Sequence, residues 1–226
     1  LETAPAPEPT FESMPAPAAG GAVAEAKEDH SVVTVHYGTD RNDTAAAEPR
    51  SRFGSARSKP VPGSSPMSYG TCKVSIPKIH KIGELEAPGM FSSWQPGKHV
   101  QLLGIDPQTG EVFHDALRAR IAASIGKQAF IFVHGFSVAF EDAARRTAQM
   151  AFDMKFDGAP IFFSWPTSVI GLTNLDITAY SVAENNSRWA TNHFATFLTD
   201  VIRKTGAESA SGEHAPERRH ASESLL

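Results

Sequence analysis

Apolar residues recur along the chain with two different periods, and these periods predict the elements of the fold. Three β-branched and aromatic runs in the first half predict strands over 31–37, 71–76 and 99–105. Beyond residue 110, apolar positions return every three to four residues, which predicts helices over 111–126, 138–155 and 184–205. Two unbroken apolar runs separate these helices and are typical of strands covered on both faces: 128–133 and 159–165.

The order of the predicted elements indicates the fold class. Helices and strands alternate through the second half of the chain, as in a mostly parallel sheet with helices on its faces. The three earlier strands are expected to pair as an antiparallel edge. The sequence therefore predicts an α/β fold.

Both ends of the chain differ in composition from this domain. Residues 1–30 are rich in Pro, Ala and Glu and carry almost no large apolar side chains, so we expect a disordered leader. Residues 207–226 are rich in Ser, Glu, Arg and His, with no apolar run, and we expect a disordered tail without a strand. Between them lies one domain over 31–206.

Bulk composition excludes some classes of protein and leaves others open. The net charge is −4 and both signs are mixed, so nothing favours binding to nucleic acid. Cys72 is the only cysteine, which excludes an intrachain disulfide. No stretch is apolar and long enough for a transmembrane segment, and nothing indicates a metal or cofactor. The compartment stays open between the cytoplasm and export or anchoring by an upstream signal, as does the oligomeric state.

Candidate chemistry lies where the two buried strands end. His134, Gly135, Phe136 and Ser137 follow the first, at the edge where α/β proteins bind ligands. Glycine and a following helix start allow backbone N–H groups to hold an oxyanion. Three roles for Ser137 stay open: helix cap, ligand contact or nucleophile, with the cap favoured because the next turn is acidic. His134 is interpreted as a brace for this loop, with a general base as the alternative.

Other polar and aromatic residues carry weaker signals. Trp165 and Pro166 end the second buried strand and are interpreted as a wall of the same cleft or as core. Asp40 and Arg41 are adjacent and are interpreted as a local ion pair. Scattered carboxylates show no acid/base pairing: Asp142, Asp153, Asp176 and Glu184. His214 and His220 have no metal-ligand context.

Four stretches of this sequence resemble a bacterial α/β-hydrolase family of unknown function within the esterase/lipase superfamily. They are VHYGTDRN, SYGTCKVSIPKIHKIGELE, FVHGFSVAFEDAARRTAQMAFDMKFDGAPIFFSWP and YSVAENNSR. The resemblance covers about residues 35–206, and the long central stretch is its most specific part. It implies an α/β-hydrolase-like sheet, an oxyanion-hole loop at His134-Gly135-Phe136, and a serine hydrolase of esterase type that acts on small-molecule esters without a cofactor.

The sequence departs from the family at two places. The family usually has Asn where this chain has Ser137, which argues against a shared catalytic role for this serine. Beyond Gly206 the family continues with a strand, a nucleophile elbow, an acid and a histidine, whereas this chain reads ESASGEHAPERRHASESLL. Two hypotheses follow. The chain represents a hydrolase that is active only in a full-length form, or it is a catalytically inactive, truncated or frame-shifted remnant or interaction protein.

Overall fold

A computed structural model describes residues 25–26, 29–167, 177–206 and 209–214 of the chain. Its centre is a seven-stranded sheet in the order β6-β5-β2-β8-β7-β9, with β1 paired to β2. The bounds of these strands are β1 Glu25–Ala26, β2 His30–Thr39, β5 Ser68–Pro77, β6 Gln101–Gln108, β7 Gln128–Val133, β8 Ala159–Ser164 and β9 Ser209–His214. A separate two-stranded hairpin consists of β3 Arg41–Asp43 and β4 Phe53–Arg57.

Strand directions divide the sheet into two parts. β2, β8, β7 and β9 run parallel, because β2 pairs with β8, β8 with β7 and β7 with β9 in the same direction. β5 runs against both of its neighbours, β2 and β6. The predicted α/β class with a mostly parallel sheet is therefore confirmed. β2 joins the antiparallel part to the parallel part, so it lies inside the sheet and not at its edge.

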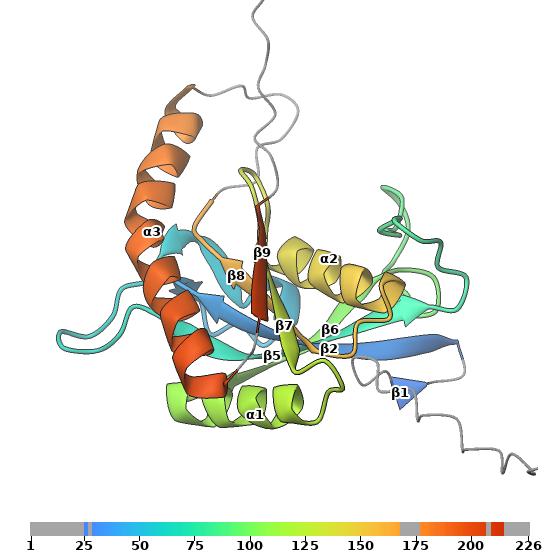
Figure 1. Cartoon of the computed structure of the whole chain (residues 1–226). Helices are drawn as coiled ribbons and strands as arrows, with labels where there is room; N and C mark the ends of the chain where they lie inside the picture. The colour runs from blue at the N-terminus through green and yellow to red at the C-terminus, as the bar shows by residue number, and fades with distance from the viewer. Residues whose placement is uncertain (1–24, 27–28, 168–176, 207–208, 215–226) are drawn as a thin grey trace, which may run out of the picture.

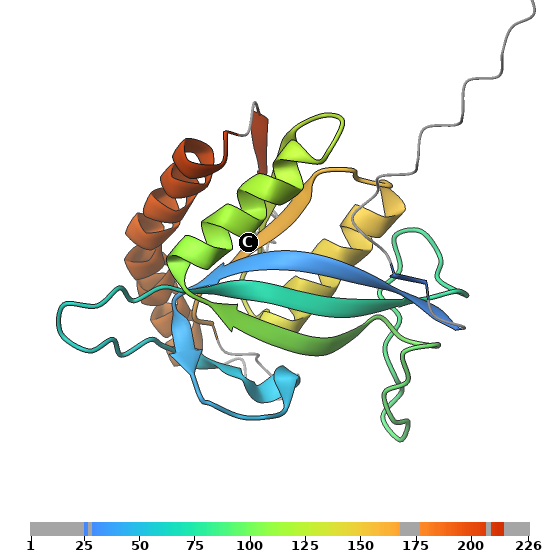
Figure 2. The same ribbon diagram turned by 90° about the horizontal axis from the view of Figure 1, so that it is seen from below.

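Helices cover both faces of the sheet. α1 (Gly110–Ala122) and α2 (Phe140–Asp153) lie on opposite faces, and α3 (Ile177–Thr205) packs beside α1 (Figure 1). Figure 2, which views the molecule from below, shows α1 lying across the strands of the sheet. A single short 3-10 turn, η1 (Pro49–Ser51), lies within the described residues, between β3 and β4.

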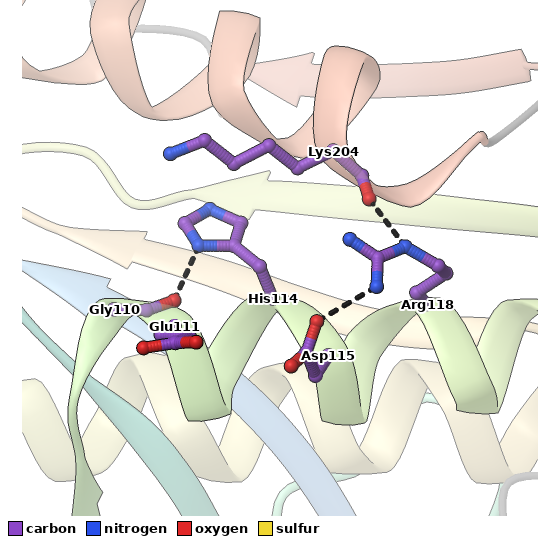
Figure 3. Close-up of a pocket in the computed structure, with 6 residues that line it drawn as sticks. All are labelled: Gly110, Glu111, His114, Asp115, Arg118 and Lys204. Atoms are coloured by element: carbon purple, nitrogen blue, oxygen red, sulfur yellow. Dashed lines mark hydrogen bonds and ion pairs between the residues drawn. The ribbon is translucent and has the colours of Figure 1, made fainter.

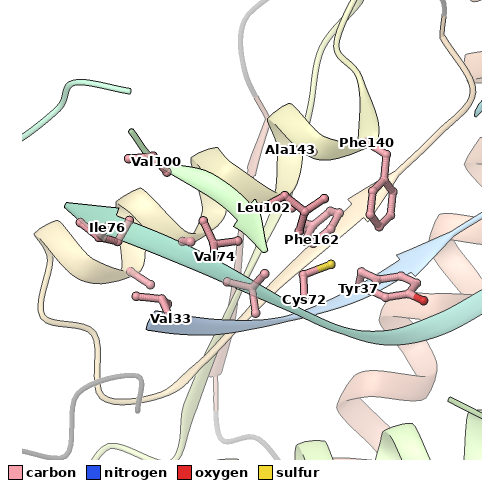
Figure 4. Close-up of a cluster of buried hydrophobic side chains, with 14 of the residues drawn as sticks. Val33, Tyr37, Cys72, Val74, Ile76, Val100, Leu102, Phe140, Ala143 and Phe162 are labelled. Carbon is pink, nitrogen blue, oxygen red and sulfur yellow. The ribbon is translucent and has the colours of Figure 1, made fainter. Parts of the chain in front are cut away.

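Two hydrophobic clusters separate the helices from the sheet. The first lies under α2 and is shown in Figure 4; its buried members include Val33, Tyr37, Cys72, Val74, Ile76, Leu102, Phe140, Ala143 and Phe162. The second lies under α1 and α3 and includes Phe113, Leu117, Ile131, Ile161, Phe163, Phe197 and Val201. Residues alternate between these clusters along β7 and β8, which explains why both strands read as unbroken apolar runs.

Several expected boundaries differ from the structure. A strand follows Gly206 after all, because β9 pairs with β7 in parallel from Gln128 to Val133, so the expectation of a tail without a strand is wrong. β1 lies within the expected disordered leader, and β3 and β4 lie in a polar segment where the sequence predicts no strand. These pieces are short and polar, so their pairing depends on neighbouring strands more than on their own pattern.

Candidate functional site

The carboxyl ends of three parallel strands bring the candidate residues together. Thr39 at the end of β2 is paired with Ser164 at the end of β8, and Val133 at the end of β7 is paired with Phe163. Arg41, His134 and Ser164 therefore meet at one edge of the sheet. Of these three residues, the sequence predicts only His134 as a site residue. Arg41 and Ser164 become its neighbours through the pairing of strands that are distant in sequence.

His134 is fully buried, and both ring nitrogens and the carbonyl have hydrogen-bond partners. Its Nδ1 bonds the carbonyl of Gly135 at 2.8 Å, and its own carbonyl accepts the indole N–H of Trp165 at 2.9 Å. Its Nε2 accepts from the backbone N–H of Trp165 at 3.2 Å and lies 3.0 Å from the Ser164 hydroxyl. The Trp165 ring stacks on the imidazole with centroids 5.3 Å apart. The proton of the neutral ring is therefore assigned to Nδ1.

Arg41 is the hub of the same network, and it is only 2% exposed. Its Nε donates to Ser164 Oγ at 2.8 Å. Its Nη2 donates to the Val138 carbonyl at 2.7 Å and lies 3.3 Å from His134 Nε2. Its Nη1 donates to the carbonyls of Gly54 and Thr167. One guanidinium therefore joins the end of β8, the loop before α2 and the β3–β4 hairpin.

The electrostatics of this network suppress base chemistry at His134. Burial, followed by the charge of Arg41, lowers the pKa of His134 from 6.5 to about 3. Ser164 is also fully buried, so the Ser164–His134 contact has the atoms of a nucleophile–base pair but no access to substrate. No carboxylate orients the ring, since Nδ1 is held by a backbone carbonyl. The geometry therefore agrees with the brace interpretation of His134.

The loop between β7 and α2 has an unusual backbone at Ser137. Its φ is +59°, in the left-handed region that side chains other than Gly, Asn and Asp seldom adopt. Its N–H donates to Thr167 Oγ1 at 3.1 Å. The residue that caps α2 is Ala139, which has no side chain to accept a hydrogen bond, so the favoured helix-cap role for Ser137 is wrong.

Gly135 and its surroundings show what the loop leaves open. A Cβ built on Gly135 would meet no atom within 4 Å, so there is space beside the backbone at this position. Phe136 packs against the cluster under α1 and α3, and both Trp165 and Pro166 are buried. Trp165 thus belongs to the wall that positions His134. The acidic first turn of α2 is partnered: Glu141 pairs with Arg50 and Asp142 with Arg145.

Asp40 points away from Arg41, so the expected local ion pair is wrong. Successive side chains alternate between the faces of a strand, and at the end of β2 Arg41 turns to the α2 side while Asp40 turns to α3. Asp40 Oδ2 bonds Nδ1 of His193 on α3 at 2.9 Å, and Asp40 is fully buried. Burial raises the pKa of Asp40, against the opposing hydrogen bond from His193.

A third histidine forms an ion-pair cluster elsewhere. His80 Nδ1 contacts Glu86 and its Nε2 contacts Asp153, both at 2.8 Å. Burial opposes protonation, but the hydrogen bonds that the ring donates to both carboxylates raise the pKa of His80 overall. The expectation that Asp153 lacks acid/base pairing is therefore wrong. This cluster ties the 77–97 loop to the end of α2, since Asp153 also accepts the N–H of Gly83.

One open pocket of about 380 Å³ lies between α1 and α3 (Figure 3). Its lining residues are Gly110, Glu111, His114, Asp115, Arg118 and Lys204. Three of its charged groups are partnered: Arg118 pairs with Asp115 and donates to the Lys204 carbonyl, and Lys204 pairs with Asp200. None of the residues of the 134–137 loop lines this pocket. No sequence pattern predicts this pocket, because it depends on how α1 and α3 cross.

Comparison with known proteins supports the family inferred from the sequence. Residues 111–211 match a family model described as "Alpha/beta hydrolase of unknown function (DUF900)". This part of the chain is therefore similar to that α/β-hydrolase family. The match contains β7, α2 and β8, and therefore the His134 loop. No curated protein and no solved structure matches the chain.

Two further findings apply to the described part of the chain. No described helix is both long enough and apolar enough to span a membrane. Within the described residues no three or more His, Cys, Asp or Glu side chains are grouped so that they could hold a metal ion. The His80 cluster is therefore best described as an ion-pair clamp.

Proposed function

We propose that this α/β-hydrolase scaffold serves the hydrolysis of small-molecule esters, with the backbone of residues 134–137 as the oxyanion-binding loop. The observation that carries the proposal is the position of this loop. It follows a central parallel strand, precedes α2, and is held by Arg41 and Trp165 beside open space at Gly135. In α/β-hydrolases the loop between such a strand and helix supplies one N–H of the oxyanion hole.

Electrostatics favour an anion at this loop. α2 has 14 residues, and the N-terminal end of a helix carries a partial positive charge that favours negative groups. The carboxylates of its first turn are neutralised by Arg50 and Arg145 and do not compete for the same site. A preformed loop of this kind stabilises a tetrahedral oxyanion without reorganisation.

The nucleophile is the part that the described residues do not supply. No described serine is hydrogen-bonded to a histidine that a carboxylate orients in turn; the Ser164–His134 pair is closed by burial. β9 occupies the place beside β7 where an elbow strand is expected, and its last residue, His214, is paired with Val133. The next three residues in the sequence are Ala215, Pro216 and Glu217, without a hydroxyl or thiol.

The lack of a hydroxyl or thiol in these three residues favours a second candidate function for this chain. It is a catalytically inactive protein that retains the 134–137 loop. In that case the loop binds an anionic or ester-type group without turnover. The two candidates differ in whether a serine nucleophile belongs to a longer form of the gene product.

The test is to translate the coding DNA beyond the Gly206 codon in all three frames. If one frame encodes an apolar strand followed by a serine elbow, that product should hydrolyse short-chain aryl esters and react with a fluorophosphonate probe. The printed chain, and the printed chain with Ser137→Ala, should remain unlabelled. If no frame encodes an elbow and the printed chain neither hydrolyses nor binds esters, the esterase proposal fails. Labelling of the printed chain that is lost in Ser137→Ala would contradict the structural role of Ser137.

A further inference from the structure

A second histidine at the carboxyl edge of the sheet has the geometry of an oriented base. His193 lies on α3 and its Nδ1 is 2.9 Å from Oδ2 of Asp40, which directly follows β2. Asp40 is fully buried, whereas the side chain of His193 is 22% exposed. Because a carboxylate can only accept, Nδ1 carries the proton and Nε2 presents a lone pair. No described residue forms a hydrogen bond to that Nε2.

The surroundings of Asp40 and His193 favour a role in proton transfer over a purely structural contact. Asp40 Oδ1 is buried and has no hydrogen-bond partner among the described residues, which is an expensive arrangement for a residue that only tethers a helix. Trp189 lies edge-on to the His193 ring, with centroids 4.4 Å apart, and Arg57 stacks over Trp189. These groups fix the ring plane, and within the described part of the chain they leave Nε2 without a hydrogen-bond partner.

The pair also lies near the His134 loop along the same edge. Asp40 follows β2, and β8 is the one strand between β2 and β7. Neighbouring strands are about 4.8 Å apart, so the backbone of Asp40 lies about 10 Å from that of His134. The two residues belong to opposite faces of the sheet, yet both lie beyond the strand ends, where ligands bind in open α/β sheets.

We propose that Asp40 and His193 form a proton-accepting dyad for the water that attacks an ester carbonyl, which rests on the function proposed above. The O–H bond of water breaks as its oxygen bonds to the carbonyl carbon, and the proton moves to Nε2 of His193. Asp40 stabilises the resulting imidazolium through Nδ1–H. The C–O bond to the alcohol then breaks, and the leaving oxygen takes the proton back from Nε2. The net reaction converts ester and water to acid and alcohol.

The first experiment measures the reactivity of His193 in the printed chain, independently of ester turnover. Diethyl pyrocarbonate acylates accessible neutral imidazoles, and mass spectrometry after short exposure gives a rate for each histidine. We expect His193 to react about tenfold faster than His99, a half-buried histidine whose Nδ1 only accepts from a backbone N–H. Asp40→Asn removes the charge that activates the ring and should slow the His193 reaction about tenfold.

A matched variant separates a base from a tether. His193→Asn places an amide N–H close to where Nδ1–H lies, so it can hold Asp40 but cannot accept the proton. A dyad predicts that its thermal midpoint stays within a few degrees of the parent while turnover of p-nitrophenyl acetate falls about a hundredfold. Equal labelling rates for His193 and His99, or a His193 rate that Asp40→Asn leaves unchanged, would overturn the dyad. Fast, Asp40-dependent labelling without any ester turnover would uphold the dyad and remove the esterase proposal instead.

Discussion

His134 and His193 lie at the same edge of one sheet, and the structure gives them opposite chemical properties. His134 is fully buried, and both ring nitrogens have described partners. His193 is partly exposed and only Nδ1 has a described partner, the carboxylate of Asp40. The two rings differ in the partner of Nδ1. In His134 the partner is a backbone carbonyl, whereas in His193 it is the buried carboxylate of Asp40.

The comparison shows that position at a strand end does not by itself indicate a catalytic group. His134 follows a buried strand and precedes a helix, which is where sequence reasoning places a functional residue. His193 lies in the middle of a helix, and its sequence neighbourhood gives no such signal. The solvent exposure of the ring and the partner of Nδ1 decide which of the two histidines can exchange a proton.

The largest effect is expected from removing the guanidinium that closes the His134 site. Arg41→Ala leaves Ser164 Oγ and three backbone carbonyls without their buried donor. We expect a loss of about 3–5 kcal/mol in the free energy of unfolding, measured by urea denaturation. Arg41→Lys keeps the charge without the planar fork and should recover only part of this. A loss below about 1 kcal/mol for Arg41→Ala would show that the brace is not a stability element.

A pH effect distinguishes His134 from an ordinary histidine. Since its pKa is lowered from 6.5 to about 3, the unfolded chain binds a proton in this range that the folded chain does not. Stability should therefore fall as pH decreases from 6.5, by about 1.4 kcal/mol per pH unit for this group, or about 2–3 kcal/mol by pH 4.5. His134→Gln should flatten this dependence in urea titrations.

His36 provides the matched control for that slope. Burial lowers its pKa to about 4, so it contributes in the same direction over a slightly narrower range. His36→Gln should remove a similar part of the slope, and the double variant should remove both parts. An unchanged slope in His134→Gln would contradict the buried, neutral state of this ring.

The contribution of His80 to the free energy of unfolding should have the opposite pH dependence, because this ring is ion-paired and His134 is buried and neutral. Its pKa is raised, so its contribution is complete below the ordinary value of 6.5 and is lost as pH rises through the higher folded value. The pKa values of Glu86 and Asp153 are lowered, so their contributions are complete above their ordinary values of 4.5 and 3.8 and are lost as pH falls through the lower folded values. The clamp is therefore strongest between about pH 4.5 and 6.5.

The variant His80→Gln tests this window. We expect it to destabilise the chain by about 2 kcal/mol at pH 5.5 and by less at pH 9. The measurement is thermal unfolding of parent and variant at both pH values. An effect that grows with pH would contradict a protonated His80 between the two carboxylates.

The smallest effect concerns the loop beside His134. Ser137 has φ +59°, and Asn adopts this conformation more readily than Ser. Ser137→Asn should stabilise the chain by about 0.5 kcal/mol, whereas Ser137→Val should destabilise it by about 1–2 kcal/mol, because β-branched residues resist positive φ. Thermal unfolding of both variants at pH 7 checks this. The family that this sequence resembles usually has Asn at this position, and the preference of Asn for positive φ is a physical reason for it.

The sequence predicts most of the fold and only part of the site. Apolar runs identify β7 and β8 because they are buried on both faces, and the resemblance places the His134 loop between a strand and α2. The prediction that Ser137 caps α2 is wrong, because a cap at this position requires the helix to begin at Val138. The helix begins two residues later, at Phe140. Residues that are distant in sequence make the remaining contacts: Arg41 with Ser164, Asp40 with His193, and His80 with Asp153. No local pattern indicates such pairs.

We propose that His134 is a neutral brace and that the loop it holds is the preformed part of the site. The most direct measurement is a ¹⁵N NMR spectrum of the histidine rings as a function of pH. We expect His134 to keep its proton on Nδ1 and to stay neutral from pH 7 to about pH 4.5, because its pKa is lowered to about 3. A ring that titrates between pH 6 and 7, or that carries its proton on Nε2, would contradict the buried network and the role given to the loop.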